Sequence, residues 1–177
     1  MAKISVLQFQ GAEQLLQTIA GDAAIKITKI YETKGKQITD EEIAKKIKLK
    51  VTEIRTILNR LHYRGIACYQ KTKNSKTGWF SYTWEIKTKR ILELLMEQHN
   101  ERIEKLETKK NFEKNYILFS CQKKCDYIPF EIATEYLFKC PECGSTLGQI
   151  DNEKRNAGLQ AELEILKKER EEIQKQL

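Results

Sequence analysis

The sequence predicts an α+β fold that is mostly α. Through most of the chain apolar residues recur at helical spacing, and only 8 Gly and 2 Pro among 177 residues interrupt them. In residues 66–86 the spacing changes to two, which is typical of a β-hairpin. Four of the five cysteines lie in two close pairs. These observations predict a helical domain that ends in a hairpin, followed by a small cysteine-rich module.

The first elements are predicted to be helices. Residues 12–20 and 23–34 are each followed by a glycine, which ends a helix readily because it adopts the left-handed conformation without a Cβ clash. Thr39 and Glu42 have the spacing of a capping box, which indicates the start of a short helix. Another helix is expected from Val51, and Gly65 is expected to end it. Its predicted core-facing stripe consists of Ile54, Ile57, Leu58 and Leu61.

A hairpin follows these helices. Residues 66–73 and 79–86 are rich in β-branched and aromatic residues and flank a polar, basic tip. One face of the second strand is expected to lie mostly in the core, and it carries Phe80, Tyr82, Trp84 and Ile86. Trp79, next to the tip, is the better candidate for an exposed contact. A short helix, a turn, a second helix and a hairpin predict a winged helix-turn-helix domain.

Two longer helices are expected in the second half of the chain. Residues 87–114 contain neither Gly nor Pro and have a narrow apolar stripe, which predicts one long helix connecting two domains. Residues 158–177 carry leucine and isoleucine near a 3-4 repeat, which predicts a C-terminal helix. The pattern leaves open whether this helix pairs with itself or with a partner.

Between these helices lies a predicted zinc ribbon whose ligands are Cys121, Cys125, Cys140 and Cys143. Zinc favours four soft ligands in a tetrahedron, and two pairs of thiolates on tight turns provide them. Four thiolates close the coordination shell, so a single structural Zn²⁺ is expected. An iron site and disulfides are the alternatives. The fifth cysteine, Cys68, is expected to be a small buried apolar residue.

These elements divide the chain into four expected parts. They are a winged helix domain at 1–88, a connecting helix at 89–115, a zinc ribbon at 116–150 and a C-terminal helix at 151–177.

The positive charge of the chain is concentrated in its first half. Residues 1–88 contain 16 Lys and Arg against 8 Asp and Glu. Their net charge of +8 exceeds the net charge of +7 of the whole chain. This excess indicates that the winged helix meets nucleic acid or an acidic protein surface, although a well-solvated surface is also compatible with it. The candidate nucleic-acid-binding residues are Lys71, Lys73, Lys76 and Trp79 on the wing, and Arg55 and Arg60 on the second helix.

The sequence contains no catalytic motif of a known kind. Neither a nucleophile elbow, nor a phosphate-binding glycine loop, nor a zinc-protease helix is present. We therefore expect no enzymatic activity. The first residues lack the features of a secretory signal, and no apolar run is long enough to span a membrane, so a cytoplasmic protein is expected.

The order of these elements resembles the archaeal transcription factor E family, the counterpart of the alpha subunit of the eukaryotic general factor E (the TFIIE-alpha family). The resemblance covers nearly the whole chain. It is most specific in ITDEEIAKKIKLKVTEIRTILNRLHYRGIA, in the wing strand WFSYTWEI and in FKCPECGSTL of the ribbon. One departure is the first cysteine pair, which has three intervening residues where the family usually has two.

The resemblance implies a basal initiation factor without catalytic activity. Such a factor joins RNA polymerase, TATA-binding protein and transcription factor B at the promoter, assists strand opening and stabilises the open complex. It implies that the winged helix lies on the polymerase clamp near the non-template strand, and that the ribbon lies towards the stalk subunits F and E. We expect an archaeal, cytoplasmic monomer that does not contact membranes.

Two other functions fit the same residues. In a sequence-specific winged-helix regulator with a structural zinc, the second helix would enter the major groove, where Arg55, Asn59 and Arg60 would read bases. In a protein-interaction adaptor, the basic wing would meet only acidic protein.

Overall fold

The computed structural model describes residues 5–35, 37–73, 75 and 78–177. The chain forms two compact units. We call residues 1–98 with 172–177 the winged-helix unit, and residues 99–171 the ribbon unit. Within the described residues, no helix combines the length and the apolar character needed to cross a lipid bilayer.

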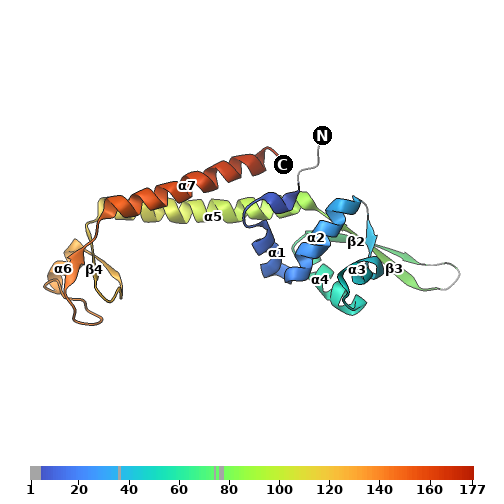
Figure 1. The fold of residues 1–177 in the computed structure, drawn as a ribbon, viewed down its shortest axis with the longest axis horizontal. Coiled ribbons are helices and arrows are strands. Elements are labelled where there is room, and N and C mark those ends of the chain that lie inside the picture. The colour runs from blue at the N-terminus through green and yellow to red at the C-terminus, as the bar shows by residue number, and fades with distance from the viewer. Residues whose placement is uncertain (1–4, 36, 74, 76–77) are drawn as a thin grey trace. The chain divides into compact units, whose positions relative to one another are not determined.

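The winged-helix unit contains mainly helices and one hairpin (Figure 1). Its elements are η1 (Val6–Gln8), α1 (Ala12–Ala20), α2 (Asp22–Lys34), β1 (Ile38–Thr39), α3 (Asp40–Ile47), α4 (Val51–Tyr63), β2 (Ala67–Lys73), β3 (Phe80–Ile86) and the first part of α5 (Thr88–Asn115). The predicted order of helices and hairpin is confirmed, and α3, α4 and the β2–β3 hairpin form the winged helix-turn-helix.

The predicted cap at the start of α3 is half formed. Thr39 accepts a hydrogen bond from the backbone N–H of Glu42 at 3.2 Å, as a capping box requires. The carboxylate of Glu42 does not return to the cap, because it pairs with the ammonium group of Lys34 in α2. The same pattern that starts α3 therefore also ties α3 to α2.

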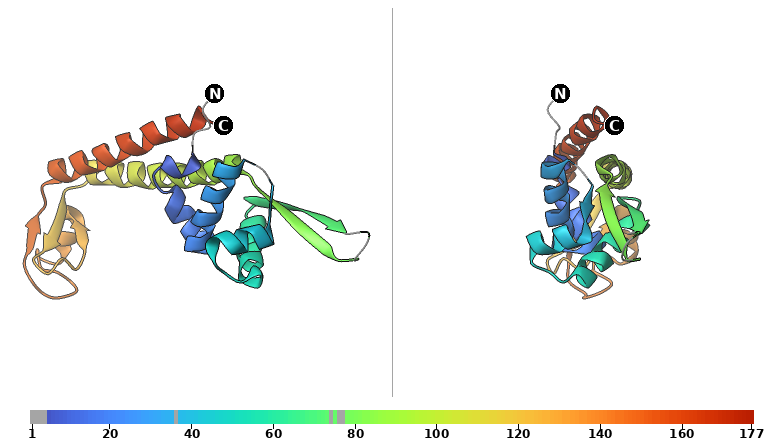
Figure 2. Two further views of the ribbon diagram at one scale, coloured as in Figure 1. Left: turned by 45° about the vertical axis from the view of Figure 1, so that its right-hand side comes forward. Right: turned by 90° about the vertical axis from the view of Figure 1, so that its right-hand side faces the viewer.

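The wing, β2 and β3, belongs to a three-stranded antiparallel sheet with the order β1-β3-β2, in which β3 is the central strand. Figure 2 shows the β2–β3 hairpin extending beyond the helices of its own unit. Register places Trp84 opposite Tyr69, Tyr82 opposite Lys71 and Phe80 opposite Lys73. Because directly opposed residues share a sheet face, these aromatic and basic side chains lie on one face of the hairpin.

The core of the winged-helix unit forms around α4. Ile54, Leu58 and Leu61 are completely buried there, which confirms the predicted stripe, although Ile57 is only partly buried. Truncation of such a fully buried leucine to alanine typically costs about 2–5 kcal/mol. Ile91 from α5 and Ile173 from α7 (Asn152–Gln174) also lie in this core.

The ribbon unit combines a small sheet with the remaining length of two long helices. Besides α5 and α7 it contains β4 (Leu118–Cys121), β5 (Tyr127–Pro129), α6 (Phe130–Glu135) and β6 (Leu147–Gln149), and its sheet order is β5-β4-β6. The predicted long helix is confirmed as α5. The C-terminal helix begins at Asn152, six residues before the predicted start, and passes through Gly158.

Within the ribbon unit, α7 packs on α5 of the same chain (Figures 1 and 2). Ile103 and Leu106 of α5 and Leu163 of α7 are buried together, and Leu159 and Leu166 pack at the edge of this cluster. Ion pairs such as Arg102–Glu162 at 2.8 Å flank the apolar stripe. The sequence did not identify the partner of the C-terminal helix. In the structure, α5 covers Leu159, Leu163 and Leu166 of α7.

Candidate functional site

The structure brings the four predicted metal ligands together. Cys121 ends β4, Cys125 lies in the turn that follows, and Cys140 and Cys143 lie in the turn before β6. Their sulfur atoms are all within 4.8 Å of one another. The cysteines of the described residues are free thiols, so the disulfide alternative does not apply to them.

The geometry of this cluster fits a metal ion. A tetrahedron with metal–sulfur distances of about 2.3 Å has sulfur atoms about 3.8 Å apart. The sulfur atoms of Cys121 and Cys143 are 3.9 Å apart. The backbone N–H of Cys125 points at the sulfur of Cys121 at 3.5 Å, as expected for a thiolate ligand. Four thiolates at these distances are typical of a closed, structural metal site.

The ionisation of the four thiols differs. Hydrogen bonds from Ser145 lower the pKa of Cys143 to about 6, and the backbone N–H of Cys125 lowers the pKa of Cys121. The neighbouring sulfur atoms of Cys121 and Cys143 raise the pKa of Cys125 to about 12, and burial raises the pKa of Cys140. A bound cation would supply the positive charge that stabilises all four sulfur atoms as thiolates.

The longer spacing of the first cysteine pair is accommodated by its turn. Lys124 adopts a left-handed conformation with φ of 55°, and its N–H donates to the carbonyl of Cys121 at 3.0 Å. In the second turn Gly144 has φ of 69°, and its N–H donates to the carbonyl of Cys140 at 2.8 Å. Both turns thus direct their paired sulfur atoms to the same point despite their different lengths.

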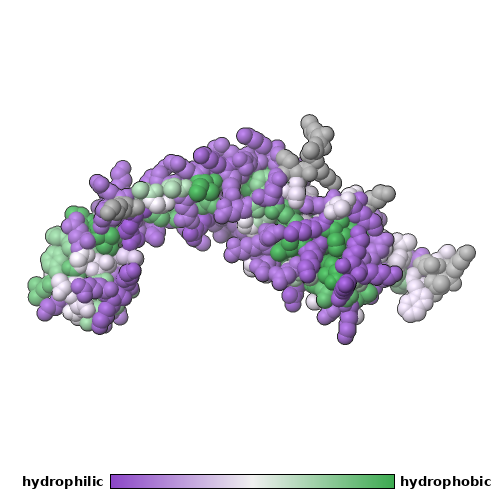
Figure 3. All heavy atoms as spheres, in the orientation of Figure 1, coloured by the Kyte–Doolittle hydropathy of each residue, from purple (hydrophilic) through white to green (hydrophobic). Residues whose placement is uncertain are grey.

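The core of the ribbon is smaller than expected from its apolar sequence. Ile128 is buried and Phe138 packs at the edge of the cysteine cluster. The other large apolar residues between the cysteine pairs are exposed; they are Tyr127, Phe130, Ile132, Tyr136 and Leu137. Part of the segment forms α6, which directs side chains outward, and Figure 3 shows apolar surface on the ribbon. The apolar core of the ribbon is therefore small, and the four-cysteine cluster forms its centre.

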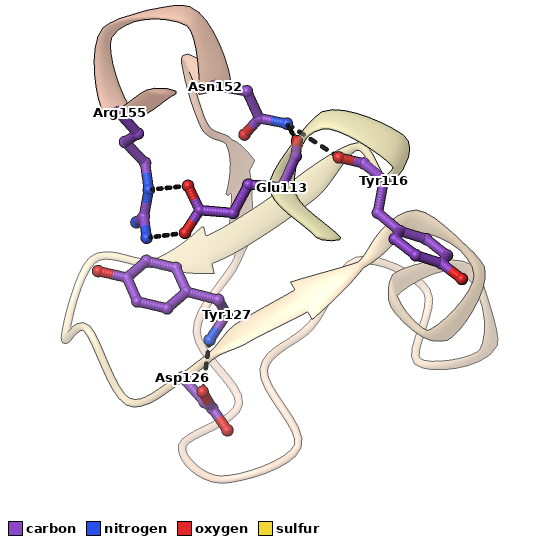
Figure 4. A network of polar contacts seen from close by, with 6 residues as sticks. All are labelled: Glu113, Tyr116, Asp126, Tyr127, Asn152 and Arg155. Carbon is purple, nitrogen blue, oxygen red and sulfur yellow. Dashed lines mark hydrogen bonds and ion pairs between the residues drawn. The ribbon is translucent and has the colours of Figure 1, made fainter. Parts of the chain in front are cut away.

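A polar network joins the ribbon sheet to the adjacent helix ends (Figure 4). Arg155 of α7 donates two hydrogen bonds to the carboxylate of Glu113, at 2.7 and 3.3 Å, and its guanidinium lies 4.1 Å from the ring centroid of Tyr127. The side-chain amide of Asn152 donates to the carbonyl groups of Glu113 and Tyr116, both at 2.9 Å. These bonds satisfy carbonyl groups that the end of α5 would otherwise leave without partners.

The wing presents both charge and aromatic surface. Trp79 is 79% exposed, in agreement with its expected position. Lys71 and Lys73 are exposed on β2, and their ammonium groups lie 3.9 and 6.0 Å from the centroid of the Phe80 ring. Lys76, the third candidate lysine, lies outside the described residues.

The expectation for the aromatic strand face is correct at its inner end and wrong at its outer end. Trp84 and Ile86 are buried at 4% exposure each, and Tyr82 is partly buried. Phe80 is 49% exposed, because it lies where the hairpin has left the helices behind. Tyr69, which the sequence did not single out, is 45% exposed on the same face. Its position opposite Trp84 in the alternating pattern of the hairpin could have indicated that it lies on the aromatic face.

The two candidate arginines of α4 have different surroundings. Arg60 is exposed. Arg55 forms an ion pair with the completely buried carboxylate of Asp40, lies 3.6 Å from Glu41 and has its guanidinium 5.6 Å from the Tyr82 ring. The hydrogen bond that Arg55 donates to Asp40 raises the pKa of Arg55, so its charge is firmly held. Arg55 therefore has a structural partner that the sequence did not reveal.

The fifth cysteine is less buried than expected. Cys68 is only partly buried, and its sulfur lies 4.0 Å from a carboxylate oxygen of Glu85. It lies on the opposite face of β2 from Tyr69, and thus away from the aromatic face of the wing.

Comparison with known proteins places this architecture in a family. Residues 11–115 match the profile of the TFIIE alpha subunit. The chain is 35% identical over 155 residues to transcription factor E of Saccharolobus solfataricus, an alignment that covers 88% of this chain and 87% of that protein. It is 34% identical over 162 residues to transcription factor E of Sulfurisphaera tokodaii, covering 89% and 91% of the two chains.

The match spans α1 to α5, and the alignments with the two relatives include most of the chain. The chain therefore belongs to the TFIIE alpha family and is a general, non-enzymatic transcription initiation factor.

Proposed function

We propose that this factor acts at the promoter together with RNA polymerase, TATA-binding protein and transcription factor B. It assists recruitment and strand opening, and it stabilises the open complex. In this proposal the winged helix contacts the polymerase clamp and the non-template strand, whereas the ribbon contacts the stalk subunits F and E. The factor acts as a cytoplasmic monomer.

The exposed wing is the observation that supports this proposal most directly. Trp79 is 79% exposed beside Phe80, and Lys71 and Lys73 are on the neighbouring strand. Proteins that bind single strands without sequence preference combine cations that contact phosphates with aromatic rings that stack on bases. An open complex provides such a strand, whereas a closed promoter does not.

The position of Arg55 supports this proposal over a sequence-specific regulator. Its guanidinium group is engaged by Asp40 and Glu41, so a bidentate contact with a guanine would require these bonds to break. A buried carboxylate that loses its cationic partner strongly destabilises the folded protein. Base reading by Arg55 would therefore conflict with the stability of the winged-helix unit.

We further propose that the four-cysteine cluster holds one structural zinc ion. Its four sulfur ligands and closed geometry suit zinc, and the small core of the ribbon leaves folding energy for the metal to provide. Iron bound in the manner of rubredoxin is the alternative that elemental analysis distinguishes. The division into parts at 1–88, 89–115, 116–150 and 151–177 also remains a proposal.

The test of the proposed function is the permanganate reactivity of unpaired thymines on a weak promoter. A cognate polymerase, TATA-binding protein and transcription factor B are present in every reaction, and the chain is added or omitted. The protein should increase both thymine reactivity and transcript yield on a closed linear template. It should have little effect on a pre-melted template, because opening is already complete there.

Two results would contradict the proposal. One is the absence of any increase in strand opening and transcript yield on the closed template. The other is a tight, sequence-dependent footprint of the chain alone on duplex DNA, which would support the regulator instead. An isolated chain should bind duplex only weakly, with dissociation constants of about 10⁻⁴ to 10⁻⁶ M at physiological salt.

A further inference from the structure

A cleft lies at the base of the wing, between α4 and the β2–β3 hairpin. It has a volume of about 280 Å³ and is lined by Arg55, Asn59, Tyr69, Tyr82 and Trp84. Two of these residues come from α4 and three from the sheet, so the winged-helix fold itself forms the cleft. We propose that this cleft binds one unpaired nucleobase of single-stranded DNA, a proposal that rests on the proposed function.

Aromatic rings form the sheet side of the cleft. The Tyr69 ring centroid lies 5.1 Å from that of Trp84 and 5.7 Å from that of Tyr82. Trp84 is 4% exposed and forms the inner end of this group, whereas Tyr69 is 45% exposed. His62 lies 5.3 Å from Tyr69, and its Nδ1–H donates to the carbonyl of Ala67 at 2.8 Å, which holds this side of Tyr69 in place. A flat heteroaromatic ligand finds a preformed stacking surface here.

Polar groups on α4 face this aromatic side. Asn59 is exposed and lines the cleft, and within the described part of the chain its side chain has no hydrogen-bond partner. A carboxamide both donates and accepts, so it can match the mixed donor and acceptor edge of a base. Arg55 is held by Asp40 and lies over Tyr82, so it adds a fixed positive charge to the lining.

The charge of the residues that line the cleft indicates whether a neutral or a cationic ligand fits its aromatic side. Aromatic clusters also bind quaternary or methylated ammonium groups, which are attracted to the faces of the rings. In this cleft Arg55 already lies over the Tyr82 ring, and no residue of the lining is a carboxylate. The cleft therefore favours a neutral heteroaromatic group over a cationic one.

The surroundings of the cleft favour a nucleic acid over an aromatic side chain of a protein. Lys71 is directly opposite Tyr82 in the sheet, and Lys73 follows it towards the tip. Arg60 is the neighbour of Asn59 on α4 and is exposed. A strand whose base enters the cleft would have its phosphates beside these cations. In a duplex the base is stacked and paired, so the cleft discriminates in favour of melted DNA.

The test uses the full-length, metal-loaded chain and fluorescence anisotropy with a labelled oligonucleotide of twelve thymidines. A second oligonucleotide has the same backbone, but its central bases are replaced by abasic sites. The intact strand should bind at least about fivefold more tightly, since stacking of one base contributes a factor of about five or more. The ratio of the two affinities is the quantity that reports on base binding.

Asn59→Ala and Tyr69→Ala should lower the affinity for the intact strand and leave that for the abasic strand unchanged. Tyr69→Phe, which keeps the ring, should retain the ratio of the wild type. Tyr63→Ala is the matched control, since Tyr63 is 88% exposed on α4 but does not line the cleft. The salt dependence should be the same in all variants, because it reports phosphate contacts. Circular dichroism verifies that each variant is folded.

Three outcomes would overturn the inference. They are equal affinity for both strands, equal losses on both strands in Asn59→Ala and Tyr69→Ala, and the absence of binding to either strand at low salt. The first outcome would show that no base enters the cleft, and the second that the cleft residues act through the fold. Failure of the proposed function is recognised separately, because permanganate reactivity would then not respond to the wild-type chain.

Discussion

The guanidinium group of Arg155 in α7 holds the carboxylate of Glu113 in α5 with two hydrogen bonds, at 2.7 and 3.3 Å. Glu113 is almost completely buried, at 3% exposure, and Arg155 also lies against the Tyr127 ring of the ribbon sheet. One arginine thus connects both helices with the sheet of the ribbon unit (Figure 4).

Glu113→Gln should destabilise the ribbon unit by about 3 kcal/mol, because breaking a buried ion pair leaves a charge without its partner. Glu107→Gln is the matched control. Glu107 pairs with Lys167 across the same two helices at 2.6 Å, but both side chains are nearly half exposed, so its loss should change stability little. Hydrogen exchange of the backbone amides of β4 and α7 measures the difference. Equal effects of the two substitutions would contradict a special role for Glu113.

Cys140→Ser should release the metal and unfold residues 116–150. Binding of zinc to small four-ligand modules provides about 10–16 kcal/mol, whereas the apolar core of this ribbon is small. Elemental analysis should find one zinc per chain in the wild type and in Cys68→Ser, whose sulfur lies outside the cluster. Near-ultraviolet circular dichroism should report loss of the ribbon alone. The presence of iron, or of no metal, in the wild type would exclude the zinc assignment.

Trp79→Ala should reduce open-complex occupancy by about tenfold or more, because base–aromatic stacking contributes about 1–3 kcal/mol per base. Lys71→Glu with Lys73→Glu should instead weaken binding of single strands broadly. Each phosphate contact that is lost should reduce the salt slope by about 0.7. Permanganate reactivity and salt titrations separate the two effects. Wild-type reactivity in Trp79→Ala would show that this side chain does not support the bubble.

Arg55→Met should destabilise the winged-helix unit by about 3 kcal/mol, because Asp40 is completely buried and loses its cation. Arg60→Met is the control, since Arg60 is exposed and its removal should have little effect on stability. Chemical denaturation followed by the fluorescence of the largely buried Trp84 measures both. A stable Arg55→Met variant that fails only on particular promoter sequences would favour base reading.

The ribbon unit should lose stability in mild acid through His99. Burial lowers the pKa of His99 below its ordinary value of 6.5, so the folded chain binds this proton less readily than the unfolded chain. Stability present above about pH 6.5 is therefore lost as the pH falls, by about 1.4 kcal/mol for each unit by which the pKa is lowered. Glu169, 3.7 Å from His99 Nε2, offsets part of this loss.

His99→Gln should reduce this acid sensitivity. The measurement is the change in Tm between pH 7.5 and 5.5 for the wild type and the variant, in a buffer that does not remove the metal. Hydrogen exchange in α5 and α7 localises the change to the ribbon unit. An identical pH dependence in both proteins would show that another group is responsible.

The sequence alone predicted the main helices, the wing hairpin and the four-cysteine cluster of this protein. Periodicity identified the stripe of α4, the alternation in β2 and β3, and the helical character of α5. Cysteine spacing identified the cluster at 121–143. These signals are local, because caps, periods and ligand spacing express what a short segment requires of its own backbone.

The tertiary structure decided which side chains these elements cover. Periodicity shows that a face is apolar but does not identify what packs on it, so the pairing of α7 with α5 could not be read from the chain. Phe80 is exposed because its strand extends past the helices, and Arg55 is engaged because the fold buries Asp40 beside it. Arg155 and Glu113 are 42 positions apart, and only packing determines that such distant charges form an ion pair.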